Sequence, residues 1–111
     1  ARQHGRVTLS FGVLGGQYQA TGHARVLSNM VDYGLDPQEA LDGARSFADA
    51  GRLDVERGYP DAVRDGLAAM GHRVAVPEAP LGAGQVIRID HAAGVLVAGS
   101  DPRRDGCALG W

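Results

Sequence analysis

Short segments in which apolar residues alternate with polar ones, or follow one another in a run, predict the strands of this chain. In Val7–Phe11 the apolar residues Val7, Leu9 and Phe11 occupy every second position, so we expect them to share one face of a half-buried strand. The same kind of signal predicts four further strands, which are Arg52–Glu56, Arg73–Val76, Gly84–Ile89 and Val95–Ala98. The last two are joined by residues 91–94 and predict a hairpin.

Apolar residues spaced three or four positions apart predict helices. The first helix covers Thr21–Tyr33, with Thr21 as its N-cap and Gly34 just beyond its end. A later one starts at Pro60 and stops before Gly71.

The segment Asp36–Glu39 also predicts the start of a helix. An acid at the N-cap, a proline at the first helical position and a glutamate at the third form a capping box. We expect a short helix that buries Ala40, Leu41 and Ala44 and ends near Arg45.

The element order is strand, helix, helix, strand, helix and three strands. It predicts an α/β (α+β) fold class, in which helices pack on a sheet whose last strands pair antiparallel. The apolar share of 44% and the charged share of 22% are ordinary for a folded protein. The 111 residues have the size of one domain, so we expect residues 1–111 to form a single domain.

Charge and cysteine content exclude several functions. The net charge is -2 without a run of one sign, so we expect neither nucleic acid nor a membrane as a partner. All 11 cations are arginine, which excludes a lysine Schiff base and the lysine of a P-loop. Cys107 is the only cysteine, so no internal disulfide can form. The compartment stays open between cytoplasm and periplasm.

The glycine segment Gly12–Gly16 lies between the first predicted strand and the first helix. Backbone amides at such a place are free to bind an anion or an oxyanion, and adjacent glycines allow close approach. A tight turn that needs positive φ is the simpler interpretation. The spacing matches neither a dinucleotide fingerprint nor a P-loop, so we expect no nucleotide cofactor.

The other polar motifs favour structural roles. His4, His23, His72 and His91 show no metal-ligand spacing, so we expect solvated or capping histidines, no metal site and no cofactor. The acids and arginines of Asp101–Gly106 could clamp a carboxylate, but tying down the C-terminal tail is the favoured role. Packing and ion pairing are likewise favoured for Arg45-Ser46-Phe47.

Taken in order, these segments resemble the C-terminal part of the small subunit of γ-glutamyltransferases (γ-glutamyltranspeptidases). The resemblance covers nearly the whole chain. It is carried by Gly12–Gly16, Asp32–Asp36 with Glu39-Ala40, Ala44–Phe47, Gly71–Val74, Gly84–Ile87, Gly99–Gly106 and the aromatic end at Trp111. The family's usual Gly-Ser-Pro-Gly-Gly is here Gly12-Val13-Leu14-Gly15-Gly16, as in a divergent branch.

The resemblance implies part of an N-terminal-nucleophile hydrolase, an αββα sandwich made when a precursor cleaves itself and exposes a threonine. In the family that threonine attacks a γ-glutamyl amide, such as that of glutathione, and passes the acyl group to water or to an amine. Two glycine amides form the oxyanion hole. By position these are Gly15 and Gly16, the catalytic residues we expect here.

The family's nucleophile precedes the stretch that matches Ala1, and neither Thr8 nor Thr21 is at an N-terminus. We therefore expect a fragment that is inactive alone. Its expected partners are a small γ-glutamyl substrate and either the rest of the precursor, a large subunit or a second copy, because one sheet face would need cover. The alternative is a catalytically inactive α/β binding or assembly module, which would be folded and monodisperse by itself.

Overall fold

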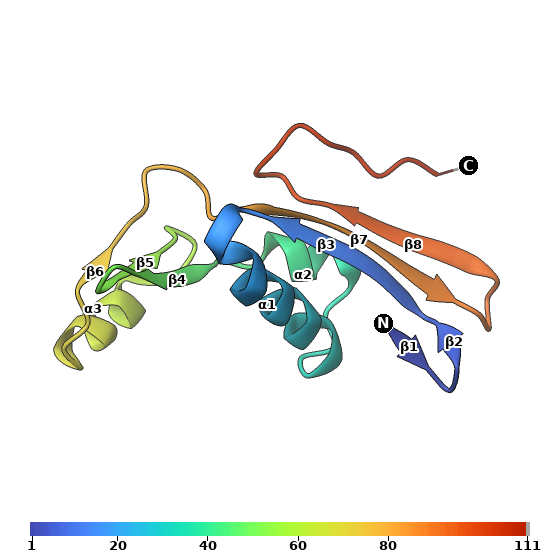
Figure 1. Ribbon diagram of the computed structural model, residues 1–111, viewed down its shortest axis with the longest axis horizontal. Helices are drawn as coiled ribbons and strands as arrows, with labels where there is room; N and C mark the ends of the chain where they lie inside the picture. Colours follow the sequence, from blue (N-terminus) through green and yellow to red (C-terminus); the bar gives the residue numbers. More distant parts are fainter. Residues whose placement is uncertain (111) are drawn as a thin grey trace. The chain divides into compact units, whose positions relative to one another are not determined.

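The structure is a computed structural model, and it describes residues 1–110. Its contacts divide the chain into two compact units, one formed by residues 1–42 with 82 onward and the other by residues 43–81. The single domain expected from length stays a prediction. No helix among the described residues has both the length and the apolar character to cross a membrane. The elements in Figure 1 are β1 (Arg2–Gln3), β2 (Arg6–Val7), β3 (Leu9–Leu14), η1 (Gly16–Tyr18), α1 (Gln19–Val31), α2 (Pro37–Asp42), β4 (Ser46–Asp49), β5 (Arg52–Val55), α3 (Asp61–Ala69), β6 (Val74–Ala75), β7 (Ala83–Asp90) and β8 (Val95–Ser100).

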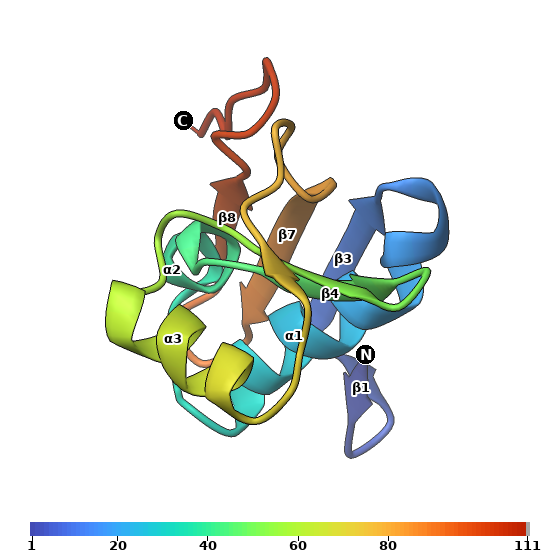
Figure 2. The same ribbon diagram turned by 90° about the vertical axis from the view of Figure 1, so that its left-hand side faces the viewer.

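The first unit is built on an antiparallel sheet with the strand order β3-β7-β8. Helices α1 and α2 cover one face of this sheet (Figure 2). Leu9, Val13 and Val86 point to that face and are buried, as period-two alternation requires. Each such side chain contributes about 1.5–3 kcal/mol to folding. The predicted mixed α/β class is confirmed.

The first predicted strand is interrupted at Thr8. The carbonyl oxygen of Ala1 accepts hydrogen bonds from the amides of both Thr8 and Leu9, at 3.2 and 3.4 Å. Two residues therefore oppose one, which is a β-bulge and bends the strand. The prediction that Val7 shares the buried face of Leu9 was wrong, because Val7 lies before the bulge and is exposed.

Helix α1 begins two residues earlier than the sequence predicted. Its N-cap is Tyr18, so the assignment of Thr21 as N-cap was wrong, and Thr21 lies inside the helix. The turn η1 leads the chain directly into α1, which supplies the helical start without a side-chain cap. The helix ends at Val31 with Asp32 as its C-cap, two residues before the predicted end at Tyr33, and Gly34 follows two residues after the cap with φ of 68°.

The capping box of α2 is confirmed. Asp36 Oδ1 accepts hydrogen bonds from the amides of Gln38 and Glu39, both at 2.8 Å, and Glu39 Oε2 accepts from the amide of Asp36 at 2.9 Å. Ala40 and Leu41 are buried as expected. The helix ends at Asp42, short of Arg45, so the expectation for Ala44 was wrong, because Ala44 lies beyond the helix and is only half-buried.

The second unit holds the sheet β4-β5-β6 and helix α3. β4 and β5 form an antiparallel hairpin, and β5 and β6 are parallel with α3 in the connection between them. Strand β4 was not predicted, because its four residues contain too few apolar positions to show a period. Its signal is the turn at Ala50 and Gly51, which both have positive φ as a two-residue hairpin requires.

Candidate active-site turn

The predicted site residues Gly15 and Gly16 form the turn that follows β3. Their φ angles are 137° and 58°, so both lie where glycine is favoured. Both are exposed. The amide of Tyr18 donates to the carbonyl of Gly15 at 3.1 Å and closes the turn. The turn that the simpler interpretation expected is therefore present.

The amides of this turn are available to a ligand. Within residues 1–110, neither Gly15 nor Gly16 donates its backbone N–H to another residue. The first amides of a helical segment have no partner within it, and adjacent free amides attract negative charge. The turn thus carries two adjacent backbone donors without an acceptor among the described residues, and a Cβ at Gly16 would meet nothing within 4 Å.

The Tyr18 ring supports the turn from the buried side. The ring is packed among three glycines: a Cβ added at Gly15, Gly22 or Gly82 would lie 3.3, 2.6 or 2.8 Å from the nearest ring atom. A Cβ at Gly15 would also lie 3.0 Å from the Cα of Gly82. Only glycine fits at these positions without a shift, so the path of the turn is fixed by close packing.

The His23 ring supports the turn from the other side. Its Nε2 accepts a hydrogen bond from the amide of Val13 at 3.2 Å, and its Nδ1–H donates to the carbonyl of Gln19 at 2.7 Å. The ring also contacts Phe11, with centroids 5.6 Å apart. The expectation of a capping histidine is confirmed, but no pattern in the sequence indicates which backbone groups His23 caps.

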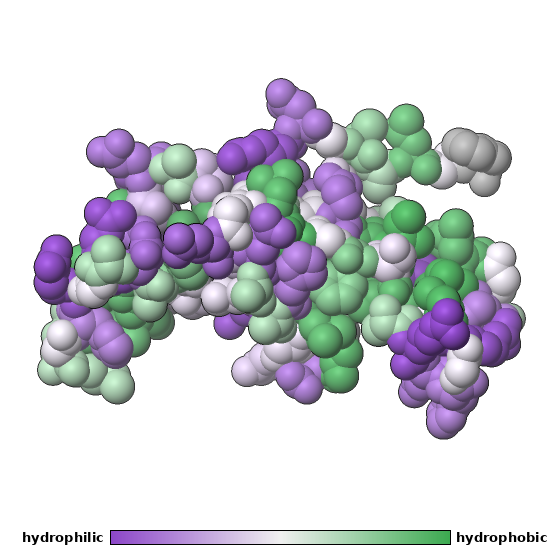
Figure 3. All heavy atoms as spheres, in the orientation of Figure 1, coloured by the Kyte–Doolittle hydropathy of each residue, from purple (hydrophilic) through white to green (hydrophobic). Residues whose placement is uncertain are grey.

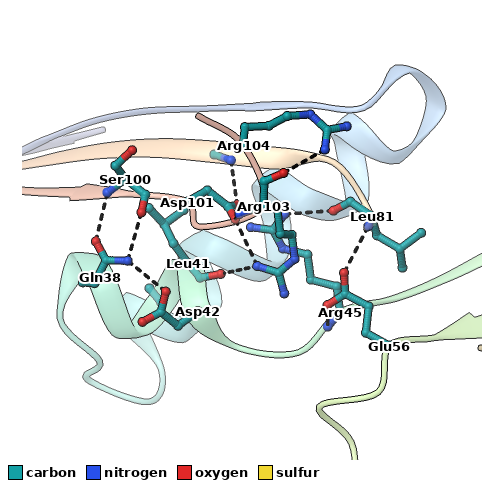
Figure 4. A network of polar contacts seen from close by, with 12 residues as sticks. Gln38, Leu41, Asp42, Arg45, Glu56, Leu81, Ser100, Asp101, Arg103 and Arg104 are labelled. Atoms are coloured by element: carbon teal, nitrogen blue, oxygen red, sulfur yellow. Dashed lines mark hydrogen bonds and ion pairs between the residues drawn. The ribbon is translucent and has the colours of Figure 1, made fainter. Parts of the chain in front are cut away.

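Asp101 lies at the same end of the sheet, where β3 and β8 end and β7 begins (Figure 1). The residue is fully buried, and its Oδ2 accepts from the amide of Gly84 at 2.8 Å. Its Oδ1 accepts from the amide of Arg103 at 3.0 Å and from the Arg103 guanidinium at 3.2 Å. The guanidinium also donates to the carbonyl of Leu41 (Figure 4).

The structural role favoured for Asp101–Gly106 is therefore confirmed. The Arg103 guanidinium is directed to groups of its own unit, and Gln38 adds two bonds to the backbone of Ser100 (Figure 4). These contacts fasten the end of β8 to α2.

Arg45 has a comparable place in the second unit. Its side chain is buried and donates to the carbonyl of Leu81 at 2.8 Å. The Glu56 carboxylate accepts from the amides of Arg45 and Leu81, at 2.9 and 3.0 Å (Figure 4). The packing role favoured for this segment is confirmed.

The remaining candidates do not converge on a site. The ring of His91 bonds to Arg6 and to the carbonyl of Val7, and Cys107 is exposed. The part of the chain that the structure describes contains no group of three or more metal-ligating side chains.

Comparison with known proteins gives a consistent result. A family model described as gamma-glutamyltranspeptidase matches residues 1–111. The glutathione hydrolase-like YwrD proenzyme of Bacillus subtilis (strain 168) is 30% identical over 96% of this chain. The acylase ACY 1 proenzyme of Pseudomonas sp. (strain SE83) is 30% identical over 67% of it. The chain spans 22% and 13% of the lengths of these two relatives.

Solved structures agree with the sequence matches. The gamma-glutamyltranspeptidase from Pseudomonas nitroreducens complexed with L-DON superposes with a TM-score of 0.89 at 27% identity, over 100% of this chain and 59% of that one. The cephalosporin acylase from Bacillus halodurans superposes with a TM-score of 0.90 at 37% identity, over 98% of this chain and 21% of that one. The expected N-terminal-nucleophile hydrolase fold is confirmed, and the chain belongs to the γ-glutamyltranspeptidase family.

Proposed function

We propose that this chain is a fragment of an N-terminal-threonine hydrolase or acyltransferase that acts on γ-glutamyl amides such as glutathione. Gly15 and Gly16 supply the oxyanion hole, and the chain supplies much of the core. The observation that carries the proposal is the pair of adjacent exposed amides after β3, in a chain that matches the family throughout.

The chemistry of the turn supports this role. When a nucleophile attacks an amide carbonyl, negative charge develops on the carbonyl oxygen, and donors fixed in advance stabilise it. Gly15 and Gly16 offer two such donors on a turn held by Tyr18 and His23. Because the turn is already formed, binding requires little reorganisation.

The nucleophile is proposed to lie outside this chain. Thr8 sits in the bulge before β3 and Thr21 lies inside α1, so both have their amines in peptide bonds. An N-terminal threonine needs a free amine as its base. The fragment is therefore proposed to be inactive alone, and two relatives carry the name proenzyme.

The uncovered face of the β3-β7-β8 sheet supports a partner, which we propose to be the rest of the precursor. Ile87 and Leu96 are 41% and 68% exposed, and Leu109 of the C-terminal segment is 80% exposed. Figure 3 shows hydrophobic residues gathered where β7 ends and β8 begins, and on the C-terminal segment. An apolar surface of this kind is usually covered in the assembled protein.

A second candidate substrate is an amide other than γ-glutamyl. It is favoured by the 37% identity to the cephalosporin acylase, against 27% to the γ-glutamyltranspeptidase from Pseudomonas nitroreducens. The oxyanion chemistry would be the same, since both reactions begin at an amide carbonyl. Only the acyl group held beside the turn would differ.

The test uses the full-length protein that contains this chain. We expect it to cleave itself and to hydrolyse a γ-glutamyl anilide, whereas preferential hydrolysis of a cephalosporin side-chain amide would favour the second candidate. Gly15→Ala should lower kcat about 10²–10³-fold, the usual cost of losing one oxyanion donor. Its added Cβ would press on Gly82 and move the turn.

Gly94→Ala is the matched control. Gly94 has φ of 69° in the hairpin between β7 and β8, and a Cβ there would meet nothing within 4 Å. This variant also places an alanine at positive φ, in the milder left-handed region and far from the Gly15 turn, so kcat should stay unchanged. A full-length protein that neither cleaves itself nor turns over either amide would overturn the enzymatic proposal and favour a binding module.

A further inference from the structure

Strand β3 lies at the edge of its sheet, so half of its backbone groups face away from β7. The amide of Ile89 donates to the carbonyl of Thr8 at 2.9 Å, so that carbonyl is directed toward β7. Since backbone groups alternate along a strand, Leu9, Phe11 and Val13 direct theirs to the open edge. The amide and the carbonyl of Leu9 both form hydrogen bonds with Ala1, and the amide of Val13 donates to the His23 ring.

His23 closes this edge near the end of β3, just before the Gly15 turn. Val13 is two residues before Gly15, and Gln19 is three residues after Gly16. The imidazole accepts from the amide of the first and donates to the carbonyl of the second. The ring therefore spans the base of the loop and fixes the end of β3 relative to the start of α1.

Few side chains could make both bonds. The site needs one acceptor and one donor on a rigid frame, and a neutral imidazole with its proton on Nδ1 provides both. The ring also contacts Phe11 in a tilted arrangement, with an interplanar angle of 52°. His23 itself is half-buried, and its two ring nitrogens are occupied by the backbone.

We propose that His23 is a positioning residue for the oxyanion hole, acting through the backbone of Val13 and Gln19 on the direction of the Gly15 and Gly16 amides. This inference rests on the function proposed above. It assigns His23 no contact with substrate and no proton transfer. Its effect is to hold the donors where the charge of the transition state develops, because small displacements of such donors are costly.

The experiment compares His23→Phe with His23→Gln in the full-length protein, assayed on the substrate that the wild type turns over. Phenylalanine keeps the ring against Phe11 but makes neither hydrogen bond, whereas glutamine can still accept from the Val13 amide. We expect His23→Phe to lower kcat roughly 10–100-fold, as expected for displaced catalytic groups, with little change in KM. We expect His23→Gln to recover most of that loss.

His72→Phe is the matched control, since His72 is exposed in the second unit and should leave kcat unchanged. Nitrogen-15 NMR of the histidines gives a second readout, in which His23 should show the neutral Nδ1–H tautomer. An inactive wild type would overturn the proposed function. An active wild type whose kcat is unaffected by His23→Phe, or whose His23→Gln variant is no better than His23→Phe, would overturn the positioning role alone.

Discussion

Two turns lie at the same end of the β3-β7-β8 sheet, and they treat their backbone amides in opposite ways. At the Asp101 turn a buried carboxylate accepts from the amides of Gly84 and Arg103. At the Gly15 turn two exposed amides have no acceptor among the described residues. The first turn holds its own anion, and the second is left open to one from outside.

Carboxylates bind pairs of backbone amides elsewhere in the chain as well. Asp36, Glu56 and Asp90 each accept hydrogen bonds from two backbone amides. Carboxylates thus bind pairs of backbone amides at several places in this protein, at the start of α2, in the β7–β8 hairpin and between Arg45 and Leu81. An unfilled pair, held by close packing rather than by an acid, is the more informative feature for function.

The largest expected effect comes from removing the carboxylate of the Asp101 turn. Asp101→Ala would leave the amide of Gly84 and part of the Arg103 guanidinium buried without an acceptor. Loss of one partner of a buried ion pair typically costs about 3–5 kcal/mol, so the urea unfolding midpoint of the full-length protein should fall clearly. Asp105→Ala is the control in the same loop, because Asp105 is exposed and should change stability by less than about 0.5 kcal/mol. Equal effects of the two variants would contradict the role given to Asp101.

A smaller effect tests how the open turn is held. Gly22→Ala would place a Cβ 2.6 Å from both Tyr18 and Val13, and overpacking of this kind costs roughly 1–3 kcal/mol. Gly66→Ala makes the same change in α3, where a Cβ meets nothing within 4 Å, and should stabilise by about 0.5–1 kcal/mol. Thermal unfolding of both variants measures the difference. Shifts of the same sign would argue against the packing described around Tyr18.

The smallest expected effect is on the pKa of Asp90, whose carboxylate binds two amides in the hairpin between β7 and β8. Hydrogen bonds from the amides of Ala93 and Ala92 lower the pKa of Asp90 below its usual value. The ionised form is therefore favoured in the folded state, so its stabilising effect is complete above the ordinary pKa of about 3.9 and is lost as pH falls through the lower folded pKa. Carbon-13 NMR of the carboxyl should show this low titration. An ordinary pKa for Asp90 would contradict the two bonds.

Local chemistry made much of the fold predictable from sequence. The capping box at Asp36 and the glycine after α1 are decided within a few residues, and both are confirmed. The apolar runs of β7 and β8 are likewise visible in adjacent residues, and the two strands pair antiparallel as the predicted hairpin. Such elements are determined by neighbouring residues, so they can be predicted without knowledge of tertiary contacts.

The remaining features depend on contacts between residues that are not adjacent in sequence and follow no period. The bulge at Thr8 depends on Ala1, and the path of the Gly15 turn depends on a tyrosine ring wedged against Gly22 and Gly82. A histidine that bonds two backbone groups shows no periodicity and no motif. The resemblance to a family pointed to Gly15 and Gly16, but the residues that support them became apparent only in three dimensions.

Glu56 has a consequence for how the chain tolerates change. Its carboxylate binds the amides of Arg45 and Leu81, the two ends of the second unit, so that segment enters and leaves at nearly one point. The second unit is therefore an insertion between α2 and β7, and Glu56 holds the two ends of the insertion together. Residues can therefore be added or deleted between Arg45 and Leu81 without changing the distance between the end of α2 and the start of β7.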